Sequence, residues 1–302
     1  MQGIIIENIA NLYKIYVSPL YLGTSGEKVY EATARGKFKK EDISPVVGDF
    51  VTFEVTDEEN KKAVINEILD RKVYVKRPKL ANITQIVFVV SSKDPKPDLI
   101  MLDKQLAFAE FLGIKALIVL NKTDLDDREE FKEIKNVYQK IGYSVIETEA
   151  KNQKGIDKLQ QKLRHNMNAF SGNSGVGKST LINGIFKQEV TLEGEISQRN
   201  KRGKNTTTSI ALYQIDEDTY IADTPGFSTF SIEEIESTEL ANYFVEFRDK
   251  ITDCEFVGCT HIKEESCGIK KAIEKGEIDL ARYERFCKIK QQLQEREEKK
   301  KW

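Results

Sequence analysis

The stretch from Gly172 to Ser179 carries residues that could hold a chain of phosphates. Its sequence, Gly-Asn-Ser-Gly-Val-Gly-Lys-Ser, fits the pattern G-x-x-x-x-G-K-[ST]. Glycines in this pattern let consecutive backbone N–H groups face phosphates at the start of a helix. We therefore predict that Lys178 acts on the β/γ-phosphates as a catalytic cation and that Ser179 ligates Mg²⁺, although a chance glycine-rich turn is the alternative for this loop alone. The predicted phosphate-binding residues are Gly172, Asn173, Ser174, Gly175, Val176, Gly177, Lys178, Ser179 and Thr180.

A second motif, at 121–124, could read a purine base. It follows an apolar run at 116–120 that is typical of a buried parallel strand, and it consists of Asn121, Lys122, Thr123 and Asp124. The Asp124 carboxylate can accept from two adjacent donors of guanine, a pair that adenine lacks. Ala150 and Lys151 end a second apolar strand and could offer backbone N–H groups to the guanine carbonyl oxygen. Each short motif alone is weak, since an ordinary loop acid fits it equally.

A third motif contains a carboxylate that could bind Mg²⁺ and a backbone N–H that could contact the γ-phosphate. Asp223 follows a short apolar strand at 220–222 and precedes Gly226. The carboxylate stands where P-loop enzymes place an outer Mg²⁺ ligand, and the Gly226 N–H stands where it could meet the γ-phosphate. Three threonines at 206–208 lie between this motif and Lys178. We take Thr207 as the switch residue that ligates Mg²⁺, although spacing does not separate it from its neighbours, and a polar strand edge is the alternative.

The order of these motifs along the chain is itself informative. The base-reading motif comes first, the phosphate loop second and the Asp223 motif third. In an ordinary GTPase the phosphate loop opens the domain and the base-reading motif closes it. The same cyclic order cut at a different point predicts a circularly permuted P-loop GTPase, which binds GTP and GDP with Mg²⁺ and hydrolyses GTP.

Cysteines gather near the end of the chain. Cys254, Cys259, His261 and Cys267 follow the pattern C-x₄-C-x-H-x₅-C. Three thiolates and one imidazole are the ligand set of a closed tetrahedral structural zinc site, and we predict one Zn²⁺ here, with buried free thiols as the alternative. Cys287 is predicted to be a packed core thiol. His165, the other histidine, is predicted to lie at the surface or to cap a helix.

Composition limits the class of protein. The chain has 302 residues, 39% of them hydrophobic, and a net charge of −2. No run is long enough to span a membrane, and the N-terminus lacks a basic segment followed by a long apolar core, so we expect a cytoplasmic protein. A nearly balanced charge confines nucleic-acid contacts to local basic patches. Without heptads or a large apolar patch, we expect a monomer.

Three domains are predicted from the pattern along the chain. Residues 1–72 carry short alternating runs that predict a partly open five-stranded β-barrel of the nucleic-acid-binding kind. Its loop at 35–40 interleaves Phe38 with cations, which suits RNA binding or, equally, a solvated hairpin. Residues 73–229 alternate strands and helices in a doubly wound α/β pattern and form the GTPase domain. Residues 230–302 are helical and hold the zinc site, with Phe286, Ile289 and Leu293 on one helix face.

These motifs resemble the circularly permuted, ribosome-small-subunit-dependent GTPases of the RsgA (YjeQ/YloQ) type. The resemblance covers nearly the whole chain and includes the pattern Asp253-Cys254-x-Phe256-x-x-Cys259-x-His261-x-x-Glu264-x-x-Cys267. It implies an N-terminal OB-fold, a central GTPase domain and a C-terminal zinc domain. It also implies a role late in small-subunit maturation, with the small ribosomal subunit and its rRNA as partners. An RNA-binding adaptor that GTP merely orders is the alternative, whereas a P-loop kinase has little support.

One departure from the family concerns catalysis. Phe227 follows Gly226, so the glutamine that orients water in many GTPases is missing, and the histidine that the family often places before its threonines is Asn205 here. An amide cannot act as a base, but it can orient water by hydrogen bonding. We hypothesise that Asn205 does so in a slow enzyme that the ribosome stimulates by ordering this loop. The cations Lys201, Arg202 and Lys204 could reach the γ-phosphate or contact rRNA.

Overall fold

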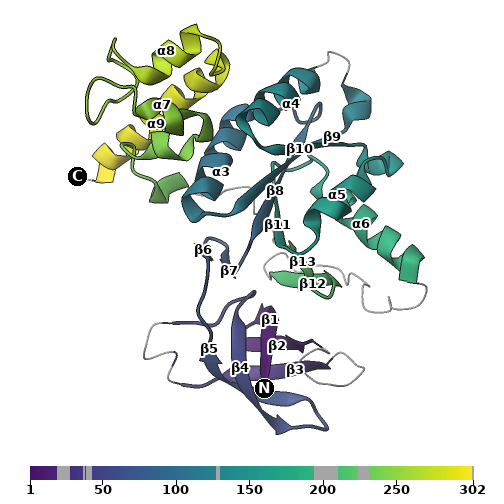
Figure 1. The fold of residues 1–302 in the computed structure, drawn as a ribbon. Helices are drawn as coiled ribbons and strands as arrows, with labels where there is room; N and C mark the ends of the chain where they lie inside the picture. Colours follow the sequence, from purple (N-terminus) through teal and green to yellow (C-terminus); the bar gives the residue numbers. More distant parts are fainter. Residues whose placement is uncertain are drawn as a thin grey trace. The chain divides into compact units, whose positions relative to one another are not determined.

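The computed structural model describes residues 1–18, 28–36, 38, 43–126, 130–193, 210–223 and 232–300 (Figure 1). The chain forms two compact units that alternate along the sequence. The first comprises Met1–Gln85, Ile156–Phe170 and Leu181–Phe227, and the second comprises Ile86–Gly155, Ser171–Thr180 and Ser228–Trp302. The expected domain limits at 72 and 229 stay a prediction.

The first unit contains a closed barrel of five short strands. They are β1 (Gln2–Ile9), β2 (Leu12–Val17), β3 (Lys28–Ala34), β4 (Phe50–Asp57) and β5 (Lys62–Ile68). The strands pair in the order β1-β2-β3-β5-β4, and an antiparallel β1–β4 pairing closes the ring. Only β3 and β5 run parallel among these pairs. The predicted five-stranded barrel is therefore confirmed, in a Greek-key arrangement of the OB type, although it is closed rather than partly open.

Strand β1 is the barrel element that pattern reasoning did not identify. Its run Ile4-Ile5-Ile6 is uniformly apolar and lacks the alternation expected of a strand with one buried face. In the structure the neighbouring residues Ile4 and Ile5 are both buried. Gly3 precedes them at a crowded crossing, where an added Cβ would lie 2.6 Å from Ile15 Cγ2 and from the Tyr16 carbonyl oxygen. A glycine is thus required for β1 to pack closely on β2.

The rest of the first unit supplies strands and helices of the α/β part. They are β6 (Tyr74–Lys76), β7 (Lys79–Ala81), α5 (Ile156–Leu163), β11 (Met167–Ser171), α6 (Lys178–Glu193), β12 (Ala211–Asp216) and β13 (Thr219–Asp223). Ser171 at the end of β11 and residues 178–180 at the start of α6 belong to the second unit. Strand β13 lies between β11, which is parallel to it, and β12, which is antiparallel. Buried Asn168 donates to the Leu163 and Tyr220 carbonyl oxygens and so ties β11 to α5 and β13.

The second unit contains three adjacent strands in the order β10-β9-β8, with β9 and β10 parallel. Their bounds, with those of the flanking helices, are β8 (Gln85–Ser91), α3 (Leu99–Leu112), β9 (Lys115–Asn121), η1 (Thr123–Leu125), α4 (Glu130–Ile141), β10 (Ser144–Thr148) and η2 (Ala150–Asn152). Every residue of β8 is buried, as the continuous apolar run predicts for a strand covered on both faces. The carboxyl ends of β9 and β10 carry the predicted base-reading residues.

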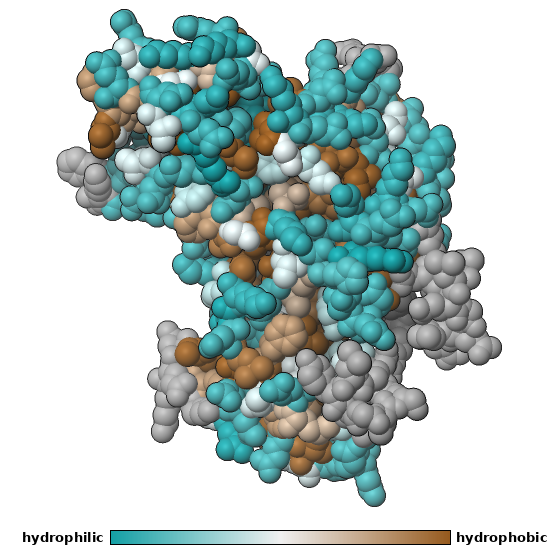
Figure 2. Space-filling view, in the orientation of Figure 1, coloured by the Kyte–Doolittle hydropathy of each residue, from teal (hydrophilic) through white to brown (hydrophobic). Residues whose placement is uncertain are grey.

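The C-terminal part of this unit is helical. It consists of η4 (Ile232–Glu234), η5 (Leu240–Tyr243), η6 (Val245–Phe247), α7 (Arg248–Ile251), α8 (Gly268–Glu274) and α9 (Leu280–Lys300). Phe244, Phe247 and Phe286 form its centre, with ring centroids 4.9–5.2 Å apart. Hydrophilic side chains cover most of the face of α7 to α9 seen in Figure 2. Phe286, Ile289 and Leu293 are buried together, which confirms the predicted apolar face of α9.

A buried ionic cluster joins α9 to α3. Arg282, only 1% exposed, contacts both Asp103 of α3 and Glu246, and Arg285 Nε lies 2.5 Å from the other Asp103 oxygen. The Tyr138 hydroxyl donates to the same carboxylate at 2.5 Å. Removing one partner of such a cluster would leave a buried charge uncompensated, so it fixes the C-terminal helices on α3.

Candidate nucleotide and metal sites

The predicted phosphate loop connects β11 to α6 and has the geometry that its glycines suggest. Gly172 has φ +145°, and an added Cβ would lie 2.3 Å from the Val89 carbonyl oxygen. Gly177 has φ +101°, and a Cβ there would lie 2.3 Å from Asn121 Nδ2. Lys178 Nζ donates to the carbonyl oxygens of Gly172 at 2.5 Å and Asn173 at 2.9 Å. Burial lowers the pKa of Lys178, a cation partly removed from water and suited to an anionic ligand.

Asn121 joins three loops of the predicted guanine site. Its amide nitrogen donates to the Val176 carbonyl oxygen of the phosphate loop at 2.9 Å. Its amide oxygen accepts from Thr148 Oγ1 at 3.0 Å and from the Ala150 N–H at 3.2 Å. Asn121 is 1% exposed, so all three bonds are shielded from water. The arrangement fixes the base-reading and phosphate-binding segments relative to each other, a role that sequence spacing did not indicate.

The residues after Asn121 place a carboxylate in solvent. Lys122 has φ +64°, and its Nζ donates to the carbonyl oxygens of Lys93 and Asp94, while its own carbonyl oxygen accepts from Ser92 Oγ at 2.6 Å. This anchoring sets the direction of η1, in which Asp124 is exposed. An anchored backbone that presents an exposed carboxylate suits recognition of a base with two adjacent donors.

Replacing Thr148 with valine is expected to weaken GTP binding about three- to tenfold. Valine keeps the shape of the 1% exposed side chain but removes the hydroxyl that donates to Asn121 Oδ1. A buried neutral hydrogen bond contributes about 1 kcal/mol. Titration of GTP binding would measure the change. Thr33→Val, at an exposed position on β3, should leave the affinity unaltered, and equal affinities for both variants would contradict the assigned role.

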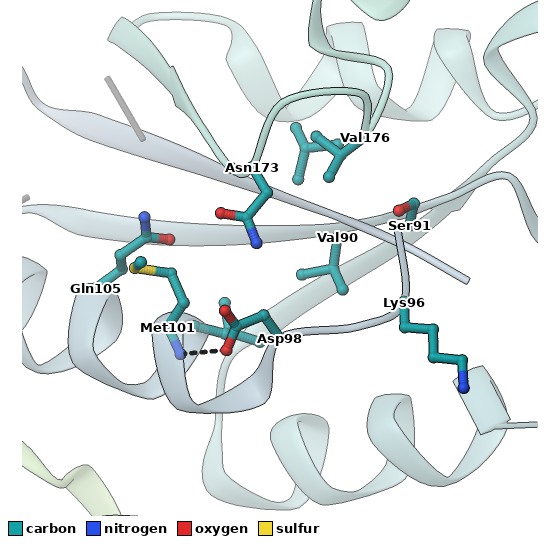
Figure 3. A pocket seen from close by; sticks show the side chains of 11 residues that line it. Val90, Ser91, Lys96, Asp98, Met101, Gln105, Asn173 and Val176 are labelled. Carbon is teal, nitrogen blue, oxygen red and sulfur yellow. Dashed lines mark hydrogen bonds between the residues drawn. The ribbon is translucent and has the colours of Figure 1, made fainter. Parts of the chain in front are cut away.

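A small pocket lies on the α3 side of the phosphate loop (Figure 3). Met101 and Gln105 of α3 face Asn173 across it, and Asp98 caps α3 by accepting from the Met101 N–H at 2.9 Å. Gln105 also donates to Ser171 Oγ at 3.0 Å, at the end of β11. Gly172, Asn173 and Val176 of the loop line this pocket, whereas its exposed residues, Ser174, Gly175, Ser179 and Thr180, do not.

Only some of the predicted magnesium and switch residues lie in the described part of the structure. Asp223 is the last residue of β13, as the apolar strand before it predicts. Asn205, the threonines at 206–208 including Thr207, Gly226 and the cations at 201–204 all lie outside the described residues. Their assigned roles stay predictions.

The cysteine cluster is assembled as its spacing predicts. Cys254, Cys259, His261 and Cys267 bring one ligand atom each within 4.8 Å of one another. His261 Nδ1 lies 3.5 Å from the sulfurs of both Cys254 and Cys267, and those sulfurs are 4.0 Å apart. Tetrahedral zinc with its usual bond lengths would place sulfurs about 3.8 Å apart and sulfur and nitrogen about 3.5 Å apart. Cys254, His261 and Cys267 therefore have the spacing of tetrahedral zinc ligands, and Cys259 lies close enough to supply a fourth.

The surroundings of this cluster also suit a metal. The Gly268 N–H donates to Cys254 Sγ at 3.3 Å, a bond that stabilises a thiolate. Burial lowers the pKa of His261 and so favours the neutral imidazole that binds metals. Burial raises the pKa of Cys259 to about 12, so the thiolates need a compensating cation. Cys287 is half-buried against the aromatic core outside the cluster, and exposed His165 contacts Asp218 at 2.6 Å, both in keeping with their expected roles.

The barrel loop at 35–40 gives limited support to RNA binding. Phe38 is only 6% exposed, because its side chain packs inward, and it cannot stack on a base. Arg35 is paired with Glu54 at 3.2 Å. Three further cations of the barrel also contact carboxylates, namely Lys14, Lys61 and Lys62. An aromatic residue among cations in sequence therefore did not indicate an exposed aromatic residue.

Among the described residues, none of the helices combines the length and the apolar character needed to cross a bilayer.

Together, the motif order and the α/β scaffold define a circularly permuted P-loop GTPase with an OB-type barrel before it and a helical region with a Cys₃His cluster after it. The family models for the RsgA GTPase and the RsgA N-terminal domain match residues 68–233 and 2–65. The chain belongs to the RsgA family of GTPases, and it is a GTPase.

Relatives extend over the full chain. A small ribosomal subunit biogenesis GTPase RsgA from Alkaliphilus metalliredigens is 38% identical over 288 residues, 95% of this chain and 96% of that protein. The protein of the same name from Clostridium botulinum is 37% identical over 302 residues, 100% of both chains. YjeQ from Thermotoga maritima has a similar structure, with a TM-score of 0.81 at 32% identity over 97% of this chain and 98% of that one. YloQ, described as a circularly permuted GTPase, also has a similar structure, with a TM-score of 0.79. It is 30% identical in sequence over 98% of this chain and 95% of that one.

Proposed function

We propose that this GTPase acts in late maturation of the small ribosomal subunit, and that the subunit stimulates its activity. The observation that carries this proposal is the full-length similarity to relatives named small ribosomal subunit biogenesis GTPase. The joint presence of a barrel, a GTPase fold and a metal-binding helical region supports it, since each relative is matched across all three.

The proposed site assigns one task to each motif. Asp124 reads guanine, with the backbone N–H of Lys151 at its carbonyl edge, while Lys178 neutralises the phosphates. The Ala150 N–H, also predicted to contact guanine, donates to Asn121 Oδ1 instead and holds this backbone in place. Ser179 and Thr207 ligate Mg²⁺, and Asn205 orients the attacking water. The Asn121 bridge supports this assignment, because it couples the base-reading and phosphate-binding loops. Asp223 and Gly226 complete the set around the metal and the γ-phosphate.

The proposed partners extend to RNA and zinc. We infer that Cys254, Cys259, His261 and Cys267 hold one structural Zn²⁺, which supplies a closed four-ligand cross-link and no reaction chemistry. The barrel and the zinc region contact rRNA or the subunit surface, and the protein works as a cytoplasmic monomer. The OB-type topology supports nucleic-acid binding by the barrel.

GTP turnover is expected to rise strongly when isolated small ribosomal subunits are added. In GTPases where a partner orders the loop and supplies or positions a cation, the increase is about 10³- to 10⁵-fold. Turnover would be measured with purified protein alone, with small subunits and with large subunits. Lys178→Ala, carried through the same assay, would report contaminating activity.

Stimulation by small subunits alone would support the proposal. Equal stimulation by both subunits, or GTP binding without stimulation by either, would contradict it. In the latter case a GTP-ordered RNA adaptor would account better for the chain.

A further inference from the structure

Thr260 connects two of the predicted metal ligands, Cys259 and His261, and its backbone is held on both sides. Its N–H and its hydroxyl donate to Glu264 at 3.0 Å and 2.8 Å. Its carbonyl oxygen accepts from Lys290 Nζ at 3.0 Å. The peptide groups on either side of Thr260 therefore have little freedom to rotate.

His261, the next residue, has an unusual backbone conformation. Its φ is +63°, in the left-handed region that residues other than glycine rarely adopt. The Tyr283 hydroxyl donates to its carbonyl oxygen at 2.7 Å. Such a conformation persists when surrounding contacts impose it. Here it directs the imidazole to within 3.5 Å of the sulfurs of Cys254 and Cys267.

Helix α9 supplies two of these contacts from one face. Tyr283 and Lys290 are seven residues apart, two helical turns, with Phe286 between them. The Tyr283 ring stacks on Phe286 at 6.3 Å, and Lys290 Nζ lies 5.8 Å from the same ring. Phe286 is fully buried, so the two donors project from a fixed part of the helical core.

Lys290 is unusual because it is only 3% exposed. A lysine on a surface helix normally extends its ammonium group into water. This one directs it to the Thr260 carbonyl oxygen, between two predicted metal ligands. Three thiolates, one imidazole and a divalent ion carry a net charge of −1, which a buried cation would offset.

We propose that Lys290, Tyr283 and Glu264 are positioning residues that hold the segment Cys259–His261 ready to bind the metal, and that Lys290 also balances the charge of the loaded site. The inference rests on the metal binding proposed above. These side chains do not touch the metal but set the direction of ligands that do.

The test compares zinc affinity in the full chain, measured by competition with a chromophoric chelator at neutral pH. Lys290→Met keeps most of the apolar stem and is expected to bind Zn²⁺ about 10- to 100-fold more weakly than the unaltered chain, the range typical of groups that orient metal ligands. Tyr283→Phe removes one oxygen atom and is expected to weaken binding by a smaller factor. Lys288→Met, at an exposed position of the same helix, is the matched control and should bind as the unaltered chain does.

Thermal unfolding of the metal-free proteins separates positioning from packing. Tyr283→Phe and Lys290→Met should unfold near the midpoint of the metal-free unaltered chain and below it when all are loaded with zinc. The inference would be overturned if Tyr283→Phe and Lys290→Met lost equal stability with and without zinc, or if they bound zinc as tightly as Lys288→Met does. Either result would leave the proposed metal site itself unaffected. An unaltered chain that binds no zinc would instead overturn the proposed site and this inference together. If Lys290→Met does not fold, Tyr283→Phe decides.

Discussion

Asp124→Asn is expected to change the preferred nucleotide from GTP to xanthosine triphosphate. The Asp124 carboxylate is exposed on η1, which follows the anchored Lys122 in the chain. It can accept hydrogen bonds from the guanine N1–H and 2-amino group together. An asparagine presents an N–H donor at one of these positions, which faces the guanine amino group and leaves it unpaired. Xanthine carries a carbonyl oxygen there, which accepts from the new amide. Sites that leave a polar group unpaired reject the ligand by about 10⁴-fold, so kcat/KM for GTP should fall by roughly that factor.

Steady-state hydrolysis of GTP, xanthosine triphosphate and ATP by the same preparation would measure the change. Asp126→Asn is the matched control. Asp126 lies two positions further on and accepts from the Phe131 N–H at 3.2 Å, at the start of α4. It should keep the preference for GTP. A variant at Asp124 that still prefers GTP by the original ratio would remove Asp124 from base recognition.

Local patterns predicted the elements whose residues act within a few positions of one another. The glycine pattern at 172–179 implies a turn at the start of a helix, and α6 does begin at Lys178. The four predicted metal ligands lie within fourteen positions, and the structure brings their ligand atoms within 4.8 Å of one another. The apolar run at 116–120 predicts β9 because a strand buried on both faces needs no alternation.

Contacts between distant segments could not be predicted in this way. The amide of Asn121 bonds to residues 27, 29 and 55 positions away, and nothing in the local pattern shows that one side chain joins three loops. Asp103 lies 179 positions from Arg282, and each alone reads as an ordinary charged surface residue. Phe38 shows the opposite error, because neighbouring cations suggested exposure for a ring that the barrel buries.

Removal of the metal is expected to destabilise the C-terminal helices, and Cys267→Ser is the sharpest variant for showing it. Cys267 is fully buried and is the N-cap residue of α8, where its side chain makes no capping hydrogen bond. Serine is favoured at this position, so the substitution removes a ligand without removing a cap. Structural zinc supplies about 10–16 kcal/mol of folding free energy in small peptides. The aromatic core around Phe286 remains without it, so we expect a loss of about 3 kcal/mol, or roughly 6–12 °C in the thermal midpoint.

The comparison that isolates the metal is between this variant and the unaltered chain treated with a chelator, which should unfold at nearly the same temperature. Cys287→Ser is the control, because Cys287 packs against the same core but lies outside the ligand cluster, and it should retain one metal ion per chain by elemental analysis. Full metal content in Cys267→Ser would show that Cys267 is not needed to hold the ion. A chelator that leaves the midpoint unchanged would show that the apolar core alone stabilises these helices, and the cluster would then have no structural role.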